Sequence, residues 1–254
     1  YPPKELHGMR AGDETLVTNA WVLLYENDVF ADSLKYDALQ KRYISANMVA
    51  VPGKTYKVIA GADGFTNVEA SAVATFPVNA ISVVHEKNTR SNSTGEQLDD
   101  VLFSFNDAGN EKNFYKTSLH SSLWARVHLF CVYSNDPAVD RIRGGVLPFE
   151  EGACIDSDQV LFSDKSFNGN LKQFSISAQT EYLKTNTDSS GNLHRPYIKR
   201  SVISEAHYKY LKATLSLYAG GVIPSYSQPV AIEGNVKNGY GLLSVFSVTT
   251  DTLR

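Results

Sequence analysis

The chain lacks the features that mark nucleic-acid-binding and membrane-spanning proteins. Its 254 residues include 24 Lys and Arg against 27 Asp and Glu, so no basic surplus is available to bind phosphate backbones. No stretch approaches the about 18 consecutive apolar residues of a transmembrane helix. The first residues, YPPKELHGMRAGDETL, also lack the basic and apolar regions of a signal peptide. We therefore expect no nucleic-acid partner, and we expect any export signal to lie upstream or to have been removed.

Linear motifs of enzymes and metal sites are equally scarce. The sequence contains no G-x-S-x-G nucleophile elbow, no P-loop and no H-E-x-x-H. Residues 185–197, TNTDSSGNLHRPY, have the spacing of a calcium loop, but Tyr197 stands where the bidentate Glu belongs, so we interpret this segment as a solvated hairpin. We predict that the chain is not an enzyme and holds no metal or cofactor. An enzyme stays open as a less favoured alternative, because catalytic groups can converge from distant strands without a linear motif.

Cysteines and paired carboxylates point to no particular chemistry. The chain has two cysteines, Cys131 in an apolar stretch and Cys154 in a loop, and the sequence is compatible both with a disulfide and with two free thiols. Neighbouring acidic residues occur in polar segments. We interpret them as solvated loop charges: Asp99-Asp100, Glu150-Glu151, and Asp156 with Asp158.

What is abundant favours strands. The 14 Tyr and 12 Phe residues, with many Val, Thr and Ser, predict a mainly β fold. Two segments alternate apolar and polar residues with the period of half-buried strands, at Val101, Phe103 and Phe105 and at Phe174, Ile176 and Ala178. Residues 16–25 and 123–133 are apolar on both faces, which indicates central strands or packing between sheets.

One segment has the pattern of a helix. Ser204 is placed to cap it, Glu205 lies in its first turn, and Tyr208, Leu211 and Leu215 form an apolar face. This face can pack on a sheet or offer its tyrosine to a ligand. We favour packing, because apolar faces of helices are usually buried.

The best polar and aromatic cluster follows residue 120. Even spacing on a strand places Trp124, Arg126 and His128 on one face together with His120. Such a face can bind a sugar or a peptide by stacking and hydrogen bonding. It can equally be an ordinary half-exposed face of a sheet.

Four motifs resemble those of a Bacteroidetes outer-membrane lipoprotein family of unknown function, domain of unknown function 4249. They are VLFSFNDAGNEKNFYKTSL, LFSDKSFNGNLKQFSI, SEAHYKYLKAT and the C-terminal SQPVAIEGNVKNGYGLLSVFS. Ala108, Gln228 and Leu243-Ser244 depart from the family pattern and affect local packing only. We interpret the matching polar and glycine residues as structural: Asp107, Asn113, Asp164, Asn168, Gly169, Asn235, Gly239 and Gly241.

The resemblance also implies a domain organisation. Residues 1–77 resemble the small immunoglobulin-like or prealbumin-like β-sandwich that begins these lipoproteins, with a turn at 26–28 and a hairpin that reverses at 62–64. This region supplies too few strands for a complete sandwich, so we expect further strands upstream. Residues 78–254 are expected to form a larger β-rich domain with one or two short helices.

The resemblance further implies a cellular location and a partner. It implies a non-catalytic accessory lipoprotein, anchored in the outer membrane and exposed at the cell surface or the periplasmic face, beside a TonB-dependent nutrient transporter. Contact with the membrane would be made only by an N-terminal lipid anchor, whose Cys is absent from this sequence. A surface module that binds glycans or peptides, or mediates adhesion, is the alternative.

Overall fold

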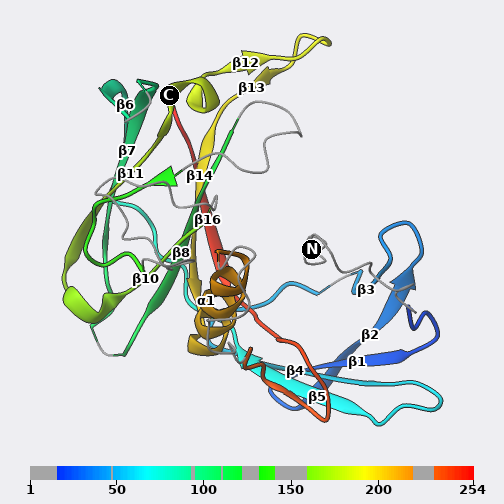
Figure 1. Ribbon diagram of the computed structural model, residues 1–254. Coiled ribbons are helices and arrows are strands. Elements are labelled where there is room, and N and C mark those ends of the chain that lie inside the picture. The colour runs from blue at the N-terminus through cyan, green and yellow to red at the C-terminus, as the bar shows by residue number, and fades with distance from the viewer. Residues whose placement is uncertain are drawn as a thin grey trace, which may run out of the picture.

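The computed structural model confirms a mainly β protein (Figure 1). It describes residues 16–46, 48–92, 95–109, 111–121, 132–140, 159–219 and 232–254. Within these ranges there are sixteen strands, one α-helix and two short 3-10 turns. None of the helical segments described is long and apolar enough to cross a bilayer.

The strands are β1 (Trp21–Glu26), β2 (Val29–Asp37), β3 (Arg42–Ile44), β4 (Thr55–Gly61), β5 (Val68–Val73), β6 (Ser82–Ser91), β7 (Gln97–Asn106), β8 (Phe114–His120), β9 (Val132–Tyr133), β10 (Gln159–Ser163), β11 (Leu171–Gln179), β12 (Asn186–Thr187), β13 (Leu193–His194), β14 (Tyr197–Ile203), β15 (Val236–Lys237) and β16 (Ser247–Thr252). The helical elements are η1 (Asp164–Ser166), η2 (Thr180–Leu183) and α1 (Glu205–Ala219).

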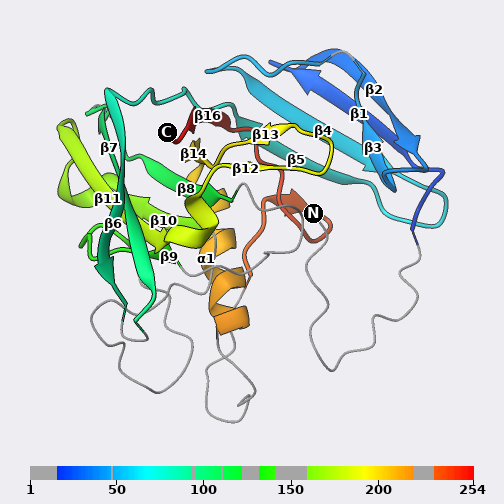
Figure 2. The same cartoon turned by 90° about the horizontal axis from the view of Figure 1, so that it is seen from above.

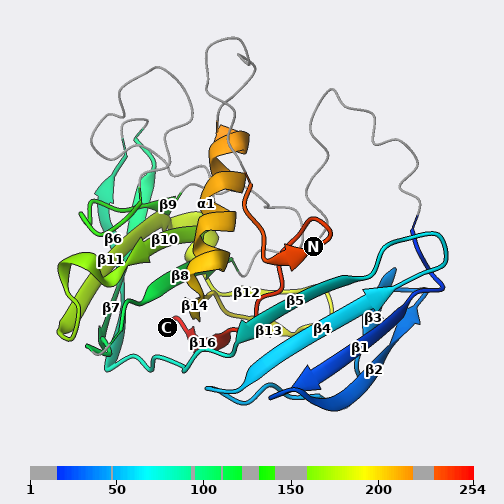
Figure 3. The same cartoon turned by 90° about the horizontal axis from the view of Figure 1, so that it is seen from below.

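The first five strands form an antiparallel sheet to which β15 is added, in the order β15-β5-β4-β1-β2-β3 (Figure 3). The predicted turn at 26–28 is confirmed: Asn27 and Asp28 both have positive φ, as a two-residue hairpin turn requires. The hairpin of β4 and β5 is confirmed as well. The described strands before Pro77 all lie in this one sheet, and the prediction of an immunoglobulin-like sandwich for residues 1–77 stays a prediction.

Two four-stranded sheets pack face to face to form a sandwich further along the chain. Their orders are β10-β8-β14-β16 and β6-β7-β11-β9, and Figure 2 shows them together on the side opposite the N-terminal sheet. The predicted alternation is confirmed, because all six residues of the two alternating segments are buried between the sheets. Six aromatic rings pack together in this core: Phe103, Phe105, Tyr115, Phe162, Phe167 and Phe174.

Helix α1 covers the outer face of the β10-β8-β14-β16 sheet. The Ser204 side chain accepts a hydrogen bond from the His207 amide (3.2 Å), which confirms the predicted cap. Tyr208 packs on Phe114 with a ring-centroid distance of 4.7 Å. Leu211 and Leu215 pack against the same apolar cluster, so the predicted apolar face of the helix is a packing face.

The last segment of the chain returns to the N-terminal sheet. Strand β15 pairs with β5, and Lys237 forms an ion pair with Glu69 (3.0 Å). The Ser247 amide donates to the Thr75 hydroxyl (3.0 Å), which in turn donates to the Val202 carbonyl (2.6 Å). Residues far apart in the sequence therefore hold the N-terminal sheet beside the sandwich.

The segment 185–197 is a hairpin, as predicted. Strands β12 and β13 pair, and the Asp188 carboxylate accepts hydrogen bonds from the amides of Ser190 and Asn192 and contacts the His194 ring (2.9 Å). The contact with His194, followed by those with Asn192, holds the pKa of Asp188 below its usual range. The Asp188 carboxylate therefore stabilises the turn of this hairpin. No group of three or more potential metal ligands occurs in the described part of the chain.

His207 joins helix α1 to the C-terminal segment and gives the fold a pH dependence. Its Nδ1 lies 2.7 Å from the Ser244 hydroxyl, and its ring is buried against Phe246. Burial, with a smaller contribution from Lys116, lowers the pKa of His207 to about 4 from its ordinary 6.5. The unfolded chain thus takes up this proton at a higher pH than the folded chain does.

We predict that acidification from about pH 6.5 to pH 4 removes up to about 3 kcal/mol of folding free energy through His207. Denaturant unfolding over this range measures the loss. A His207→Asn variant, which does not titrate there, should show a flatter profile. Identical pH profiles for the two proteins would contradict this assignment.

Candidate functional site

The matching polar and glycine residues of the two central family motifs meet at one end of the sandwich. The segment 107–113 connects β7 in one sheet to β8 in the other, and the segment 164–170 connects β10 back to β11. Both segments cross between the sheets at the same end. Asp107, Asn113, Asp164, Asn168 and Gly169 link the two segments through side-chain and backbone hydrogen bonds, and we call this group the loop clasp.

Asp107 joins the two crossing segments directly. Its Oδ2 accepts a hydrogen bond from the Gly169 amide (2.8 Å), and its Oδ1 accepts one from the Tyr115 hydroxyl. Asp107 and Tyr115 are both buried. Burial raises the pKa of the Tyr115 hydroxyl, and the hydrogen bond to Asp107 raises it further, so Tyr115 stays protonated and acts as the donor.

Asp164 and Asn113 form a second link. The Asn113 amide donates to Asp164 Oδ2 (2.7 Å), and the Asp164 amide donates to the Asn113 carbonyl (3.1 Å). The Asn113 side chain donates to the carbonyls of Ala108 (2.8 Å) and Glu111 (3.1 Å). At position 108 the hydrogen-bond acceptor is the backbone carbonyl. The contact with Asn113 therefore does not depend on the Pro that the family usually has at this position.

Close backbone contact completes the loop clasp. Gly169 has φ +73°, and a Cβ built on Gly109 would lie 2.7 Å from the Gly169 Cα. The Asn168 side chain donates to the Glu111 carbonyl (3.4 Å). Both carboxylate oxygens of Asp107 accept hydrogen bonds, whereas only Oδ2 of Asp164 does. Asp164 Oδ1 is buried with no partner in the described residues. These contacts serve the connection between the sheets rather than an open reaction centre.

The C-terminal motif residues lie elsewhere, against β5. The Asn235 side chain pairs with both the amide and the carbonyl of Leu243 (2.8 Å each) and also donates to the Ser71 carbonyl (3.0 Å). Gly241 has φ +128°, and a Cβ on Gly239 would lie 2.8 Å from a Val68 methyl group. The turn at Asn238, which has positive φ, holds β15 beside β5.

The candidate ligand-binding residues Trp124, Arg126 and His128 lie outside the described residues. Cys131, Cys154 and the acidic residues 150, 151, 156 and 158 do so as well. The described part of that cluster is His120 at the end of β8. Its ring stacks on Tyr197, with centroids 4.6 Å apart.

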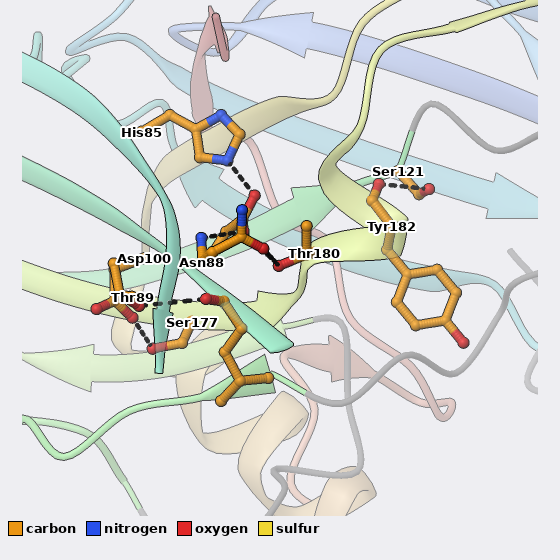
Figure 4. Close-up of polar contacts among 10 residues, drawn as sticks. His85, Asn88, Thr89, Asp100, Ser121, Ser177, Thr180 and Tyr182 are labelled. Atoms are coloured by element: carbon orange, nitrogen blue, oxygen red, sulfur yellow. Dashed lines mark hydrogen bonds and ion pairs between the residues drawn. The ribbon is translucent and has the colours of Figure 1, made fainter. Parts of the chain in front are cut away.

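The interpretation of Asp99-Asp100 as solvated loop charges is wrong. Asp99 lies in β7 with its side chain 1% exposed, and His85 Nε2 is 2.7 Å from its carboxylate. The Asn88 amide and the Thr180 hydroxyl also donate to Asp99. Figure 4 shows its partners His85, Asn88 and Thr180 close together. Strand alternation continues from Val101 back to residue 99 and places both on the inner face, which is the signal that could have revealed this buried carboxylate.

This buried network has the wrong order for nucleophilic catalysis. Burial raises the pKa of Asp99, but hydrogen bonds from Thr180, the Asn88 amide and His85 together outweigh burial and hold the pKa below its usual value. Thr180 donates to the carboxylate and not to the imidazole, whereas a hydroxyl nucleophile needs the imidazole as its base. The network instead fixes the irregular part of β6, where Asn88 has positive φ, onto β7 and η2.

Asp100 points to the opposite side of β7. The Ser177 hydroxyl donates to it, and Arg90 donates to Ser177 (2.6 Å), as Figure 4 shows for Ser177 and Asp100. The same view shows the Ser121 hydroxyl donating to the Tyr182 carbonyl (2.8 Å). Asp100 is thus held by a hydroxyl and a nearby guanidinium, and it is not a free acid.

Sequence patterns also did not reveal a buried arginine in the core. Arg200 is 7% exposed, pairs with Asp251, and lies over the Phe103 ring at 5.8 Å from its centroid. Its Nε and Nη1 have no partner in the described residues. Arg200 also lines a cavity that has room for about one water molecule. Burial lowers the pKa of Arg200. The cavity is too small for an organic substrate.

The loop clasp predicts a large effect for Gly109→Ala. The added methyl group meets the Gly169 backbone, which cannot move without breaking the bond to Asp107, so we expect a loss of about 2 kcal/mol or more of folding free energy. Gly95→Ala is the reference for backbone strain without a steric contact, because Gly95 has φ +86° and its Cβ would meet open space, and it should cost about 1 kcal/mol. Thermal unfolding measures both. A Gly109→Ala protein no less stable than Gly95→Ala would contradict the clasp.

The C-terminal turn predicts a smaller loss. Gly241→Ala and Gly239→Ala should each cost about 1 kcal/mol, from positive φ in the first case and from the Val68 contact in the second. Tyr240→Ala, at a fully exposed neighbour, should melt like the parent protein. Unchanged melting of both glycine variants would show that this turn does not stabilise the fold.

Comparison with known proteins gives a family without a known activity. The family model described as Domain of unknown function (DUF4249) matches residues 5–252. No curated protein and no solved structure matches the chain. Because the match spans nearly the whole sequence, the chain belongs to the DUF4249 family.

Proposed function

We propose that this protein is a non-catalytic accessory lipoprotein of the outer membrane that works beside a TonB-dependent nutrient transporter. The cellular location and the partner are those implied by the resemblance of the four motifs to this family. The observation that carries the non-catalytic part is the loop clasp, since the polar side chains of the two central motifs bond to one another or to backbone groups. A family whose shared polar residues hold the fold together is better suited to present a surface than to perform a reaction.

The buried His85 and Asp99 support the same proposal. They are the described pair that most resembles a catalytic couple, yet they lie 3% and 1% exposed and bond to strand and turn groups. A catalytic pair has to reach a substrate. A buried pair that fixes a strand irregularity fits a structural role.

The partner is tested in the native host with the full-length protein carrying a C-terminal tag. Cells are cross-linked, outer membranes are isolated, and the tagged protein is purified under denaturing conditions. We expect a TonB-dependent barrel among the cross-linked proteins, and we expect the reverse purification through that barrel to recover the tagged protein. Labelling with an alkyne-bearing fatty acid should mark the protein itself.

A second, unrelated tagged lipoprotein of the same membrane serves as the control for crowding. Recovery of the same barrel with both proteins would remove the support for a specific partnership. Absence of any barrel from the cross-linked material, or absence of the fatty-acid label, would overturn the corresponding part of the proposal.

A further inference from the structure

The N-terminal sheet has one face that carries an aromatic strip. Trp21, Leu23 and Tyr25 alternate along β1 and therefore point to the same side. The residues paired with them on β4 are Gly61, Ile59 and Lys57, which share this face. Sequence patterns had indicated that residues 16–25 are apolar on both faces, and β1 is indeed central in its sheet, between β4 and β2.

The Trp21 ring lies on a glycine. A Cβ at Gly61 would overlap the six-membered part of the Trp21 ring, so the ring covers the bare backbone at that point. Trp21 is nevertheless 42% exposed. One side of the indole is supported by the sheet, while a large part of the ring remains open to solvent.

Neighbouring groups hold the second and third rings. Phe30 lies opposite Tyr25 on β2, with their rings edge to face at a centroid distance of 6.0 Å. Lys57 reaches over the Tyr25 ring at 5.2 Å and forms an ion pair with Asp28. Phe30 is 56% exposed. We call Trp21, Tyr25 and Phe30 the aromatic platform.

The two faces of this sheet differ in burial. Val22, Tyr56 and Ala70, which the strand pairings place on the other face, are 8%, 2% and 6% exposed. On that face the Val51 amide also donates a hydrogen bond to the Tyr56 hydroxyl (2.8 Å). The aromatic platform therefore lies on the less buried face, with Trp21 and Phe30 both substantially exposed. Figure 3 shows that the sheet itself extends away from the sandwich.

Polar groups flank the platform on the same face. Ser33 lies opposite Leu23 on β2, and Ser71 lies opposite Lys57 on β5. The next positions are Glu69 and Lys237, which pair with each other. The face thus combines the rings with a hydroxyl group on the β2 side and with hydroxyl, carboxylate and ammonium groups on the β5 side.

We propose that the aromatic platform binds an extended glycan chain. Sugar rings present C–H faces that pack on aromatic rings and a rim of hydroxyl groups that need hydrogen-bond partners, and this face offers both kinds of contact. Trp21 and Tyr25 are four residues apart on one strand, about 13 Å between their Cα atoms, which suits a linear oligosaccharide lying along β1. A protein partner would instead be expected to meet a continuous apolar core without charges in it. This inference does not depend on the transporter or on the lipid anchor.

Intrinsic fluorescence of purified protein tests the platform. The chain has two tryptophans, so a Trp124→Phe variant leaves Trp21 as the single reporter. It is titrated with cellohexaose, xylohexaose, mannohexaose and chitohexaose, and binding to immobilised forms of the same four glycans is measured in parallel. We expect at least one to change the Trp21 emission saturably, and Trp21→Ala to weaken binding about tenfold or more.

Three controls separate the platform from other causes. Tyr240→Ala removes a fully exposed aromatic ring from the turn beyond β15, outside the platform, and should bind like the parent protein. Trp21→Phe should retain part of the affinity, since it keeps a ring on Gly61. Circular dichroism confirms that each variant is folded.

Failure of all four glycans to bind, or binding that survives Trp21→Ala, would overturn the proposal. Sedimentation measures the other occupant of such a face, a second copy of this chain. A dimer that Trp21→Ala dissociates would assign the face to self-association, and it would likewise overturn the glycan proposal.

Discussion

The sandwich depends on two buried aspartates that bind backbone amides across its crossing segments. Asp107 receives the Gly169 amide and Asp164 receives the Asn113 amide, so each segment that leaves one sheet is held by the segment that leaves the other. Buried carboxylates are costly unless hydrogen-bonded, and here Tyr115 and backbone N–H groups supply those bonds. Closing this end aligns the two sheets over their aromatic core. This geometric requirement explains the polar residues of the two central family motifs.

A second constraint arises from the return of the C-terminal segment. Asn235 and β15 attach to β5, and Ser247 attaches to Thr75, so the N-terminal sheet is held at its β5 side. The opposite part of the sheet, with β1 and β2, stays away from the sandwich (Figure 1). This attachment leaves the strands bearing the aromatic platform free on one face. The C-terminal motif thereby connects the sandwich to the sheet that bears the aromatic platform.

Local patterns predicted the elements whose signals are local. The turn at Asn27-Asp28, the cap at Ser204 and the alternation around Phe103 each depend on a few neighbouring residues, and the structure confirms them. The loop clasp joins positions more than fifty residues apart, so its residues could be singled out by resemblance while their contacts could not be derived. The interpretation of Asp99 as a solvated charge is wrong because its partners His85 and Thr180 come from other elements, β6 and η2, which the local sequence does not reveal. Trp21 was read as part of a buried strand, because a run of apolar residues does not tell which face of a sheet is left uncovered.

The central claim is that the shared polar residues close the sandwich, and hydrogen exchange of two backbone amides tests it most directly. The Gly169 and Asn113 amides donate to the two aspartates, although Gly169 itself lies at the surface. If the clasp is part of the cooperative fold, both amides exchange only in global unfolding, at the same free energy as amides in the core strands β7 and β11. If the segments open independently, both exchange at the rate of an exposed loop while the core strands remain protected. The first result is the one we predict, and the second would contradict the account.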